Sequence, residues 1–317
     1  MYSFAILTNS AWTFGSGALL GQQQKPLCLF SKELGAFHDP LPAGLPSVIG
    51  SGGIVPPAGR ARLSDTRQFT VGDRDRRMKT AGGWKVGKIH NRLLASLSAS
   101  DLALLTRHLH EVPIEQGQTL EDRGRTIDRV YFPQTGMISL IVTMAEDDAL
   151  EVGTVGHEGA IGMTAGLGSG ISFIQALVQV SGAALCVSAS GFQAVASQSP
   201  RIRAMIARYA EVLLGQVQQT AACNGLHDAS SRVSRWLLQT GDKTDSDVIP
   251  FTHEFLGRML GVQRTTVSQV IGELQAAGLV STQRGQIRIV NRAGLSKEAC
   301  ECYEIVRRHI DRLFSKP

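Results

Sequence analysis

Five polar residues in the C-terminal part of the chain have the side chains that proteins use to read DNA bases. They lie within FTHEFLGRMLGVQRTTVSQVIGELQAAGLV, residues 251–280, and are Gln263, Arg264, Thr265, Ser268 and Gln269. Arginine pairs with guanine in the major groove, glutamine pairs with adenine, and threonine offers a hydroxyl or a methyl group to thymine. A helix face that only needed solvation would more usually carry Lys and Glu. The residue types therefore favour a DNA-reading face.

Two short helices around a glycine turn must position these side chains. Thr252 is a good N-cap for a first helix over residues 254–260, and Gly257 leaves room for a second helix to cross it closely. Gly261 can take the left-handed conformation that ends the first helix. The positions expected to be buried or to anchor the turn are Leu256, Leu260, Val262, Val267, Val270, Ile271 and Leu274. This spacing predicts a helix-turn-helix.

A β-hairpin is predicted directly after the second helix. The stretch STQRGQIRIV consists of two short strand-like segments about Arg284-Gly285, which would make the module winged. Arg284, Arg288 and Arg292 could then meet the DNA backbone. Residues 252–292 hold five Lys and Arg against two Asp and Glu. A locally basic module suits phosphate contact, and the N-terminus of a helix also attracts phosphate.

The preceding region divides into a β-rich part and a long helix. Residues 91–198 begin with a helix that Ser98 or Ser100 can cap, and short β segments with Gly-rich turns follow. This texture predicts an antiparallel barrel or jelly roll. A long helix with a continuous apolar stripe is expected over residues 199–222, with Ser199 as its N-cap. The stripe could pack on the barrel, form a dimer coiled coil, or do both on different faces.

The remaining residues complete the predicted domain plan. A winged helix-turn-helix is assigned to residues 223–295 and a C-terminal helix to residues 296–317. Within the winged module, a helix is expected to end near Gly241, and DKTDSD, residues 242–247, to form a linker or surface loop. The predicted fold class is α+β, with an N-terminal β jelly-roll domain, a long dimerisation helix and a C-terminal winged helix-turn-helix.

The first 90 residues differ in composition from the rest of the chain. They hold 11 of the 32 Lys and Arg but 5 of the 27 Asp and Glu, so the net charge of +5 originates there. Residues 39–62 are rich in Pro, Gly and Ser and cannot bury enough apolar surface to fold. We expect residues 1–90 to be a disordered or non-native extension, and the functional protein to begin near Met78. A native peptide mapping before Met78 would contradict this start.

Several classes of protein are disfavoured by what the sequence lacks. The five cysteines are scattered and odd in number, which suits a reducing cytoplasm better than a disulfide framework. No apolar run approaches the roughly 20 residues that a membrane-spanning helix needs. The segment HEGAI is not a His-Glu-x-x-His metal motif, because its fifth residue is Ile161. We therefore expect no enzyme, no catalytic residues and no membrane partner.

From about Asn91 to Phe314, the chain resembles the Crp/Fnr family of transcription regulators. The resemblance rests on IEQGQTLEDRGRTIDRVYFPQTGMISLIV, on GTVGHEGAIGMTAGL, and on the helix-turn-helix with its wing. It implies a cyclic-nucleotide-binding-like barrel and a homodimer on a two-fold-symmetric stretch of double-stranded DNA, with RNA polymerase as a further candidate partner. By motif position, Arg264, Thr265 and Gln269 take the base-reading places. Thr252 and Gln263 fall where the family contacts phosphate.

The resemblance also marks a candidate effector pocket, at Glu158 and Gln175. Family members that bind cyclic nucleotides use a Gly-Glu pair and a later Arg-Ser/Thr-Ala, and Glu158 takes the place of that glutamate. Ile174 and Gln175 stand where the arginine and serine would be. Without the arginine, a buried cyclic phosphate would lack a counter-charge, so a cyclic nucleotide is disfavoured and no cofactor is assigned.

Metal sites find little support in the sequence. Residues 91–185 contain no cysteine for an iron–sulfur cluster, and the two thiols of Cys300-Glu-Cys302 do not complete a site. Haem ligation by His108, His110 or His157 stays open, although surface or turn histidines are more common. No metal is predicted. The competing hypothesis for the whole chain is a ligand-binding or protein-interaction module whose winged domain does not bind DNA.

Overall fold

The computed structural model describes residues 88–144, 149–168 and 170–315. The extension is predicted at residues 1–90, and its residues 1–87, with the predicted start near Met78, lie outside these ranges. The described chain is anchored at its start by Asn91, whose side-chain nitrogen donates to the carbonyl oxygens of Pro133 and Gly159 at 3.0 and 2.8 Å. The carboxamide oxygen of Asn91 also accepts from the Leu94 amide at 3.1 Å, so Asn91 caps the first helix.

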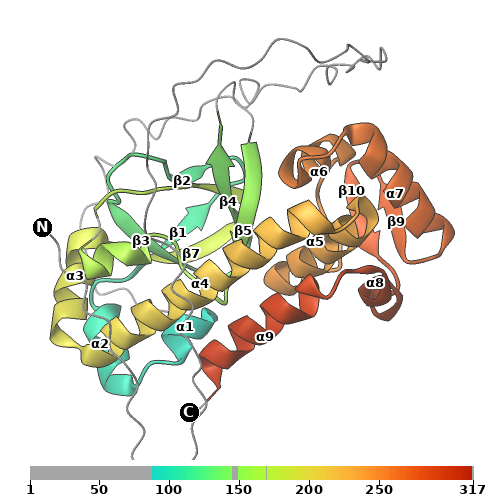
Figure 1. Cartoon of the computed structure of the whole chain (residues 1–317). Helices are drawn as coiled ribbons and strands as arrows, with labels where there is room; N and C mark the ends of the chain where they lie inside the picture. The colour runs from blue at the N-terminus through green and yellow to red at the C-terminus, as the bar shows by residue number, and fades with distance from the viewer. Residues whose placement is uncertain (1–87, 145–148, 169, 316–317) are drawn as a thin grey trace, which may run out of the picture. The chain divides into compact units, whose positions relative to one another are not determined.

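Two antiparallel sheets build the N-terminal barrel-like domain, in agreement with the predicted jelly roll (Figure 1). One sheet has the order β1-β7-β3 and the other the order β2-β6-β4-β5. The strands are β1 (His110–Ile114), β2 (Thr119–Glu121), β3 (Arg129–Pro133), β4 (Met137–Thr143), β5 (Ala149–Val155), β6 (Gln175–Val180) and β7 (Gly182–Ser188). Apolar side chains such as Ile138, Leu140 and Val178 fill the space between the sheets.

Short helices cover one end of this barrel. They are α1 (Arg92–Ala95), α2 (Ala99–Thr106), the 3-10 helix η4 (Met163–Leu167) and α3 (Ala189–Gln198). Ser98 is the residue that caps α2, because its hydroxyl accepts from the Asp101 amide at 3.1 Å. Phe192 of α3 packs edge-on against Phe132 of β3, with ring centroids 5.9 Å apart.

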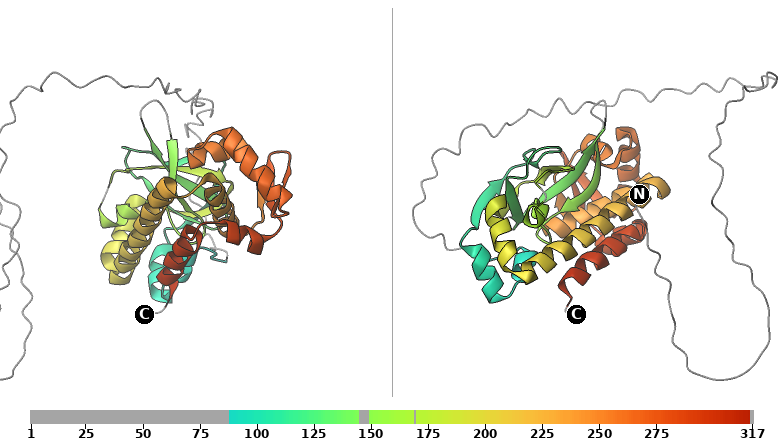
Figure 2. Two further views of the ribbon diagram at one scale, coloured as in Figure 1. Left: turned by 45° about the vertical axis from the view of Figure 1, so that its right-hand side comes forward. Right: turned by 60° about the vertical axis from the view of Figure 1, so that its left-hand side comes forward.

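The long helix α4 (Pro200–Leu226) follows, with Ser199 as its predicted N-cap. Its residues Ile202, Met205, Ile206 and Tyr209 are buried in the barrel core, so the apolar stripe does pack on the barrel. The C-terminal helix α9 (Cys302–Phe314) lies along α4, as the views in Figures 1 and 2 show. None of the helices within the described ranges is long and apolar enough to cross a membrane.

The winged domain lies between α4 and α9 in the sequence. It comprises α5 (Ala229–Thr244), β8 (Val248–Ile249), α6 (His253–Leu260), α7 (Arg264–Ala276), β9 (Val280–Gln283), β10 (Gln286–Ile289) and α8 (Arg292–Glu298). Its core surrounds Trp236, which contacts Phe251 and Phe255 edge-on. The small sheet has the order β8-β10-β9.

One predicted boundary in this domain is wrong. The helix α5 does not end near Gly241 but continues through Asp242 and Lys243 to Thr244. Asp245 then ends the helix in the left-handed conformation, with φ of 50°. The polar letters DKTDSD suggest a loop, yet Lys243 is buried and forms an ion pair with Glu158. That tertiary contact stabilises the last turn of the helix.

Candidate nucleic-acid interface

The turn between α6 and α7 has the geometry that the sequence predicts. A Cβ atom at Gly257 would lie 2.8 Å from the Val262 carbonyl oxygen, so only glycine lets the chain cross here. Gly261 has a φ of 65° and caps α6 in the left-handed conformation. The buried positions are Leu256 and Leu260 on α6, and Val267, Val270, Ile271 and Leu274 on α7.

Burial of that face of α7 leaves a polar face exposed at its start. Arg264, Thr265 and Gln269 are all exposed. The Gln269 side-chain nitrogen donates to the Glu273 carboxylate at 3.0 Å, one turn further along α7. The Thr265 hydroxyl donates to the Gln263 side-chain oxygen at 3.4 Å. The structure therefore brings these predicted base-reading residues together on one accessible surface.

Two further residues lie at helix starts, where free backbone N–H groups attract phosphate. Gln263 is the N-cap residue of α7, and its side chain makes no capping hydrogen bond. Thr252 is the N-cap of α6, where its hydroxyl oxygen accepts from the Phe255 amide at 3.2 Å. Both residues are exposed.

Ser268 differs from its predicted position on the outward face. It is half-buried, and its hydroxyl lies 3.0 Å from Nδ1 of His253 on α6. Partial burial, followed by the charge of Arg264, lowers the pKa of His253 below its ordinary value. The pair joins the two helices of the motif through a side-chain hydrogen bond.

The wing is the hairpin of β9 and β10, with the predicted Arg284-Gly285 turn at its tip. Gln283 pairs with Gln286, and both turn residues have positive φ, 29° for Arg284 and 77° for Gly285. Arg284 and Arg288 are exposed. A two-residue turn of this kind fits the right-handed twist of its strands, so it holds Arg284 at the apex of the wing.

Arg292 does not join Arg284 and Arg288 on the exposed surface of the wing, contrary to the sequence-based expectation. Its guanidinium pairs with Asp242, and a second nitrogen donates to Asp247 at 2.9 Å. The Tyr303 hydroxyl also donates to Asp242 at 2.8 Å. Arg292 therefore joins α8 to the end of α5 and to α9, and its charge is already compensated.

In the barrel, the two residues of the candidate effector pocket make separate contacts. Glu158 follows β5 and accepts the Gly156 amide at 3.1 Å, while its carboxylate pairs with the ammonium of Lys243. Burial would raise the pKa of Glu158, but the Lys243 charge and hydrogen bond outweigh it and lower the pKa overall. Gln175 lies on β6 opposite Ile141. Glu158 and Gln175 share no hydrogen bond within the described residues.

The space next to Glu158 is small. A cavity between the barrel and α4, lined by residues that include Glu158, Tyr209 and Gln216, has about 10 Å³ of room, roughly that of one water molecule. The Tyr209 hydroxyl fills part of this region, donating to the Ala160 carbonyl and accepting its amide, both at 3.0 Å. The Gln216 side chain donates to the Thr154 carbonyl at 3.2 Å.

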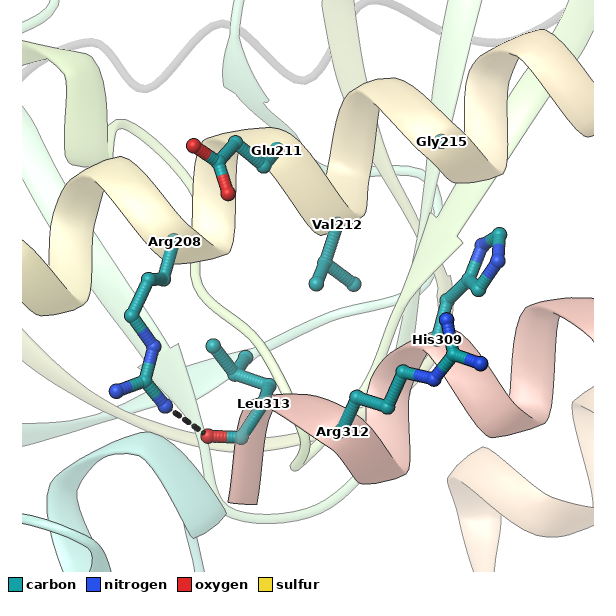
Figure 3. A pocket seen from close by; sticks show the side chains of 7 residues that line it. All are labelled: Arg208, Glu211, Val212, Gly215, His309, Arg312 and Leu313. Atoms are coloured by element: carbon teal, nitrogen blue, oxygen red, sulfur yellow. Dashed lines mark hydrogen bonds between the residues drawn. The ribbon is translucent and has the colours of Figure 1, made fainter. Parts of the chain in front are cut away.

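A larger groove lies between α4 and α9 (Figure 3). Arg208 and Glu211 border it from α4, and His309 and Arg312 border it from α9. Val212 and Leu313 supply apolar surface. Arg208 donates to the Leu313 carbonyl oxygen across one end of the groove. Of these residues, only Val212 belongs to the apolar stripe that the sequence predicts for the long helix.

A buried carboxyl group connects the barrel to the winged domain. Glu151 of β5 accepts from the Trp236 indole nitrogen of α5 at 2.8 Å and from the Ser139 hydroxyl. Burial raises the pKa of Glu151 to about 7, against the opposing effects of these two hydrogen bonds and of the Arg235 and Lys243 charges. Sequence reasoning missed this residue, because β5 was expected to be an ordinary barrel strand.

One family of known domains matches the winged part of the chain. The family described as the Crp-like helix-turn-helix domain matches residues 231–298. This match runs from the first turn of α5 to the end of α8 and includes the exposed residues Arg264, Thr265 and Gln269. No curated protein shows significant sequence similarity to the chain. The chain thus carries a Crp-like helix-turn-helix domain with a wing beside a barrel, which supports a DNA-binding transcription regulator.

Solved structures share the fold across both domains. FixK2 from Bradyrhizobium japonicum is 15% identical with a TM-score of 0.53, and the match covers 61% of this chain and 98% of that one. The c-di-GMP-responsive global regulator CLP from Xanthomonas campestris is 18% identical with a TM-score of 0.51, covering 61% and 99%. A CRP-family transcriptional regulator from Thermus thermophilus is 18% identical with a TM-score of 0.51, covering 59% and 96%.

Proposed function

We propose that the chain acts as a homodimer that binds an inverted-repeat operator, with α7 of each subunit in one major groove. The observation that carries this proposal is the exposed face of Arg264, Thr265 and Gln269, which the buried side of α7 holds at the helix start. In such dimers the half-sites lie about 34–36 Å apart, one turn of DNA.

Each exposed residue of the winged domain has a chemical role in this proposal. Arg264 pairs with a guanine and Gln269 with an adenine, while Thr265 contacts a neighbouring base. Thr252 and Gln263, together with the helix N-termini beside them, contact phosphates on one side of α7. Arg284 contacts the backbone from the wing. Ser268 orients α7 through His253 instead of reading a base.

The outer face of α4 supports the dimer. Seven of its exposed residues recur at a spacing of three and four, the spacing of the seam in a two-stranded coiled coil. They are Ala204, Ala207, Glu211, Leu214, Gln218, Ala221 and Gly225. Leu214, at the middle of this seam, is 56% exposed in the single chain. A second copy of α4 would cover it, while the opposite stripe stays packed on the barrel.

A signal received by the barrel would reposition the winged domains through α4. We infer that the signal is not a cyclic nucleotide, because Lys243 already neutralises Glu158 and the adjoining cavity has room for about one water molecule. We assign the regulator to the cytoplasm, where its operator DNA lies, with RNA polymerase as a further candidate partner.

Selection of bound duplexes from a random DNA pool, using the full chain with and without cyclic AMP, tests the proposal. We expect an inverted repeat to be enriched equally under both conditions. Enrichment only with cyclic AMP would overturn our inference about the signal. Failure to enrich any sequence would instead favour a protein-interaction module, and half-sites without symmetry would contradict the dimer.

A further inference from the structure

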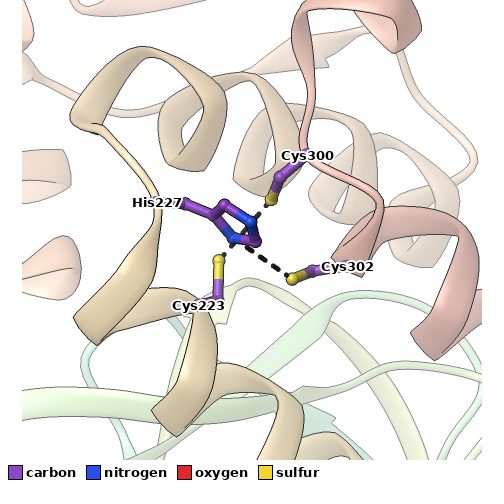
Figure 4. Close-up of side chains that lie close together, drawn as sticks. All are labelled: Cys223, His227, Cys300 and Cys302. Carbon is purple, nitrogen blue, oxygen red and sulfur yellow. Dashed lines mark hydrogen bonds between the residues drawn. The ribbon is translucent and has the colours of Figure 1, made fainter.

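Three cysteines and one histidine converge at the base of the winged domain. Cys223 and His227 come from the end of α4, whereas Cys300 and Cys302 stand at the junction of α8 and α9. Their sulfur and nitrogen donor atoms all lie within 4.8 Å of one another. Figure 4 shows the three sulfur atoms and the imidazole ring directed at one another from these two segments. The three thiols are buried.

The distances between these donor atoms fit a single tetrahedral ion. The Sγ atoms of Cys223 and Cys300 are 3.6 Å apart, and Sγ of Cys302 is 3.5 Å from Nδ1 of His227. A tetrahedral zinc site with usual bond lengths separates two sulfurs by about 3.8 Å, and a sulfur from a nitrogen by about 3.5 Å. A disulfide would instead need the two sulfurs about 2.05 Å apart.

Neighbouring groups orient the donors as they do around bound metals. The Nε2 atom of His227 lies 3.4 Å from the Glu301 carboxylate, so a carboxylate holds the far side of the ring while Nδ1 faces the sulfurs. The Gln219 side-chain nitrogen donates to Cys302 Sγ at 3.0 Å. Cysteines that only packed against one another would need neither the histidine nor the carboxylate behind it.

Two positively charged side chains of α5 accompany the cluster. Arg232 and Arg235 of α5 interact electrostatically with Cys223. Each keeps a buried Nε donor that has no hydrogen-bond partner within the described residues. Three thiolates around one divalent cation leave a net charge of −1, which these two guanidinium groups would offset.

We propose that Cys223, His227, Cys300 and Cys302 bind one Zn²⁺ ion in a closed tetrahedral site. Thiolate-rich donor sets select zinc over magnesium or calcium, and four protein ligands leave no open position for catalysis. Iron–sulfur clusters attach their ligands to several iron atoms and prefer four thiolates, so they suit this compact Cys₃His set less well.

The ion would connect the two ends of the winged domain. Cys223 and His227 precede α5, while Cys300 and Cys302 follow α8, so the bound metal fixes how the domain joins α4 and α9. Zinc at this position is structural, and it fixes the direction in which α5 leaves α4. The site stands on its own geometry and does not depend on the proposed operator.

Metal analysis of the purified full chain is the first test. We expect about one zinc per chain in the wild type and in Cys186→Ala, which removes a barrel thiol, and below about 0.1 in Cys302→Ser. Because Cys302→Ser could misfold, cobalt substitution of the wild type provides a second measurement. Tetrahedral thiolate-bound Co²⁺ should give intense visible bands, which added zinc abolishes.

A variant that keeps all four ligands tests the orienting carboxylate. Glu301→Gln should weaken zinc affinity by about 10–100-fold in competition with a chromogenic chelator. Glu298→Gln, an exposed change at the end of α8, should leave it unchanged. Wild-type protein that takes up no zinc on reconstitution, a Cys223–Cys300 disulfide found by mass spectrometry, or bound iron with acid-labile sulfide would each overturn the assignment.

Discussion

At the scale of single residues, the proposed reading of DNA bases depends first on Arg264. It is the first residue of α7, exposed, and next to the free backbone N–H groups of the helix start. A guanidinium there can donate two parallel hydrogen bonds to a guanine while the helix end attracts the adjoining phosphate. Loss of this side chain should therefore reduce discrimination between DNA sequences more than loss of a positive charge elsewhere on the protein would.

Arg264→Ala should weaken binding to the selected operator by about 1–3 kcal/mol and relax the preference at one base pair of each half-site. Fluorescence anisotropy with operator duplexes carrying single substitutions measures both effects. Arg307→Ala removes the same charge from α9, where Arg307 pairs with Glu304, and should leave discrimination intact. If Arg264→Ala keeps the full preference at every position, Arg264 has no part in base reading.

The sequence predicted this surface because alternation of apolar and polar residues determines which side of a helix faces outward. It could not predict the contacts that Ser268 and Arg292 make. Their partners, His253 on α6 and the two aspartates near the end of α5, come together only in the tertiary structure. The cysteine cluster was missed for the same reason, since Cys223 and Cys300 are 77 positions apart.

At the scale of elements, the crossing of α6 and α7 depends on one missing side chain. The closest approach is at Gly257, where any Cβ would press on the Val262 carbonyl oxygen at 2.8 Å and the Arg264 amide nitrogen at 3.3 Å. The motif was predictable because its glycines and apolar residues are local in sequence. The end of α5 was not predictable, because the ion pair of buried Lys243 with Glu158 keeps a polar, loop-like sequence helical.

Gly257→Val should destabilise the winged domain by about 1–3 kcal/mol, because the added side chain forces the backbone of the turn apart. Urea denaturation followed by tryptophan fluorescence reports on this, since Trp236 lies in that core. Gly272→Ala on α7 is the matched control: a Cβ there meets nothing within 4 Å, and the higher helix propensity of alanine should stabilise by up to about 1 kcal/mol. Equal stability of the two variants would contradict the close crossing.

At the scale of the whole molecule, the described chain is joined across its domains by buried polar contacts. Glu151 and Glu158 belong to the barrel, and their partners Trp236 and Lys243 belong to α5. Buried polar pairs of this kind tolerate little displacement, because a separated partner loses its hydrogen bond without regaining water. A shift of the winged domain therefore requires both contacts to break and to be solvated.

The burial of Glu151 should make stability depend on pH. Burial raises its pKa from 4.5 to about 7 in the folded chain, so the stability gained with a neutral Glu151 is full below pH 4.5 and disappears as the pH rises through 7. Between pH 5 and pH 8, the wild type should lose about 1–3 kcal/mol more than Glu151→Gln, whose amide cannot ionise. The exposed Glu111→Gln should behave as the wild type does. Parallel losses in Glu151→Gln and the wild type would assign the effect to other groups.

The proposed dimer seam gives a prediction at the same scale. Leu214→Glu places two carboxylates opposite each other at the two-fold axis of the proposed dimer. Because burying these unpaired charges is costly, the dissociation constant of the dimer should rise by roughly two or more orders of magnitude. Sedimentation equilibrium measures the change. Leu167→Glu alters a leucine on the barrel that is 53% exposed, similar to Leu214, and should leave the dimer intact. A dimer of unchanged affinity in Leu214→Glu would place the interface elsewhere.

The contact between His227 and Cys302 brings the two ends of the winged module together. His227 precedes the module and Cys302 follows it, and the Nδ1 atom of His227 lies 3.5 Å from the Sγ atom of Cys302. Units with neighbouring ends tolerate circular permutation and transplantation into loops of other proteins. The module from α5 to α8 could thus be reconnected across its base and reopened at the Arg284-Gly285 turn, keeping its core around Trp236.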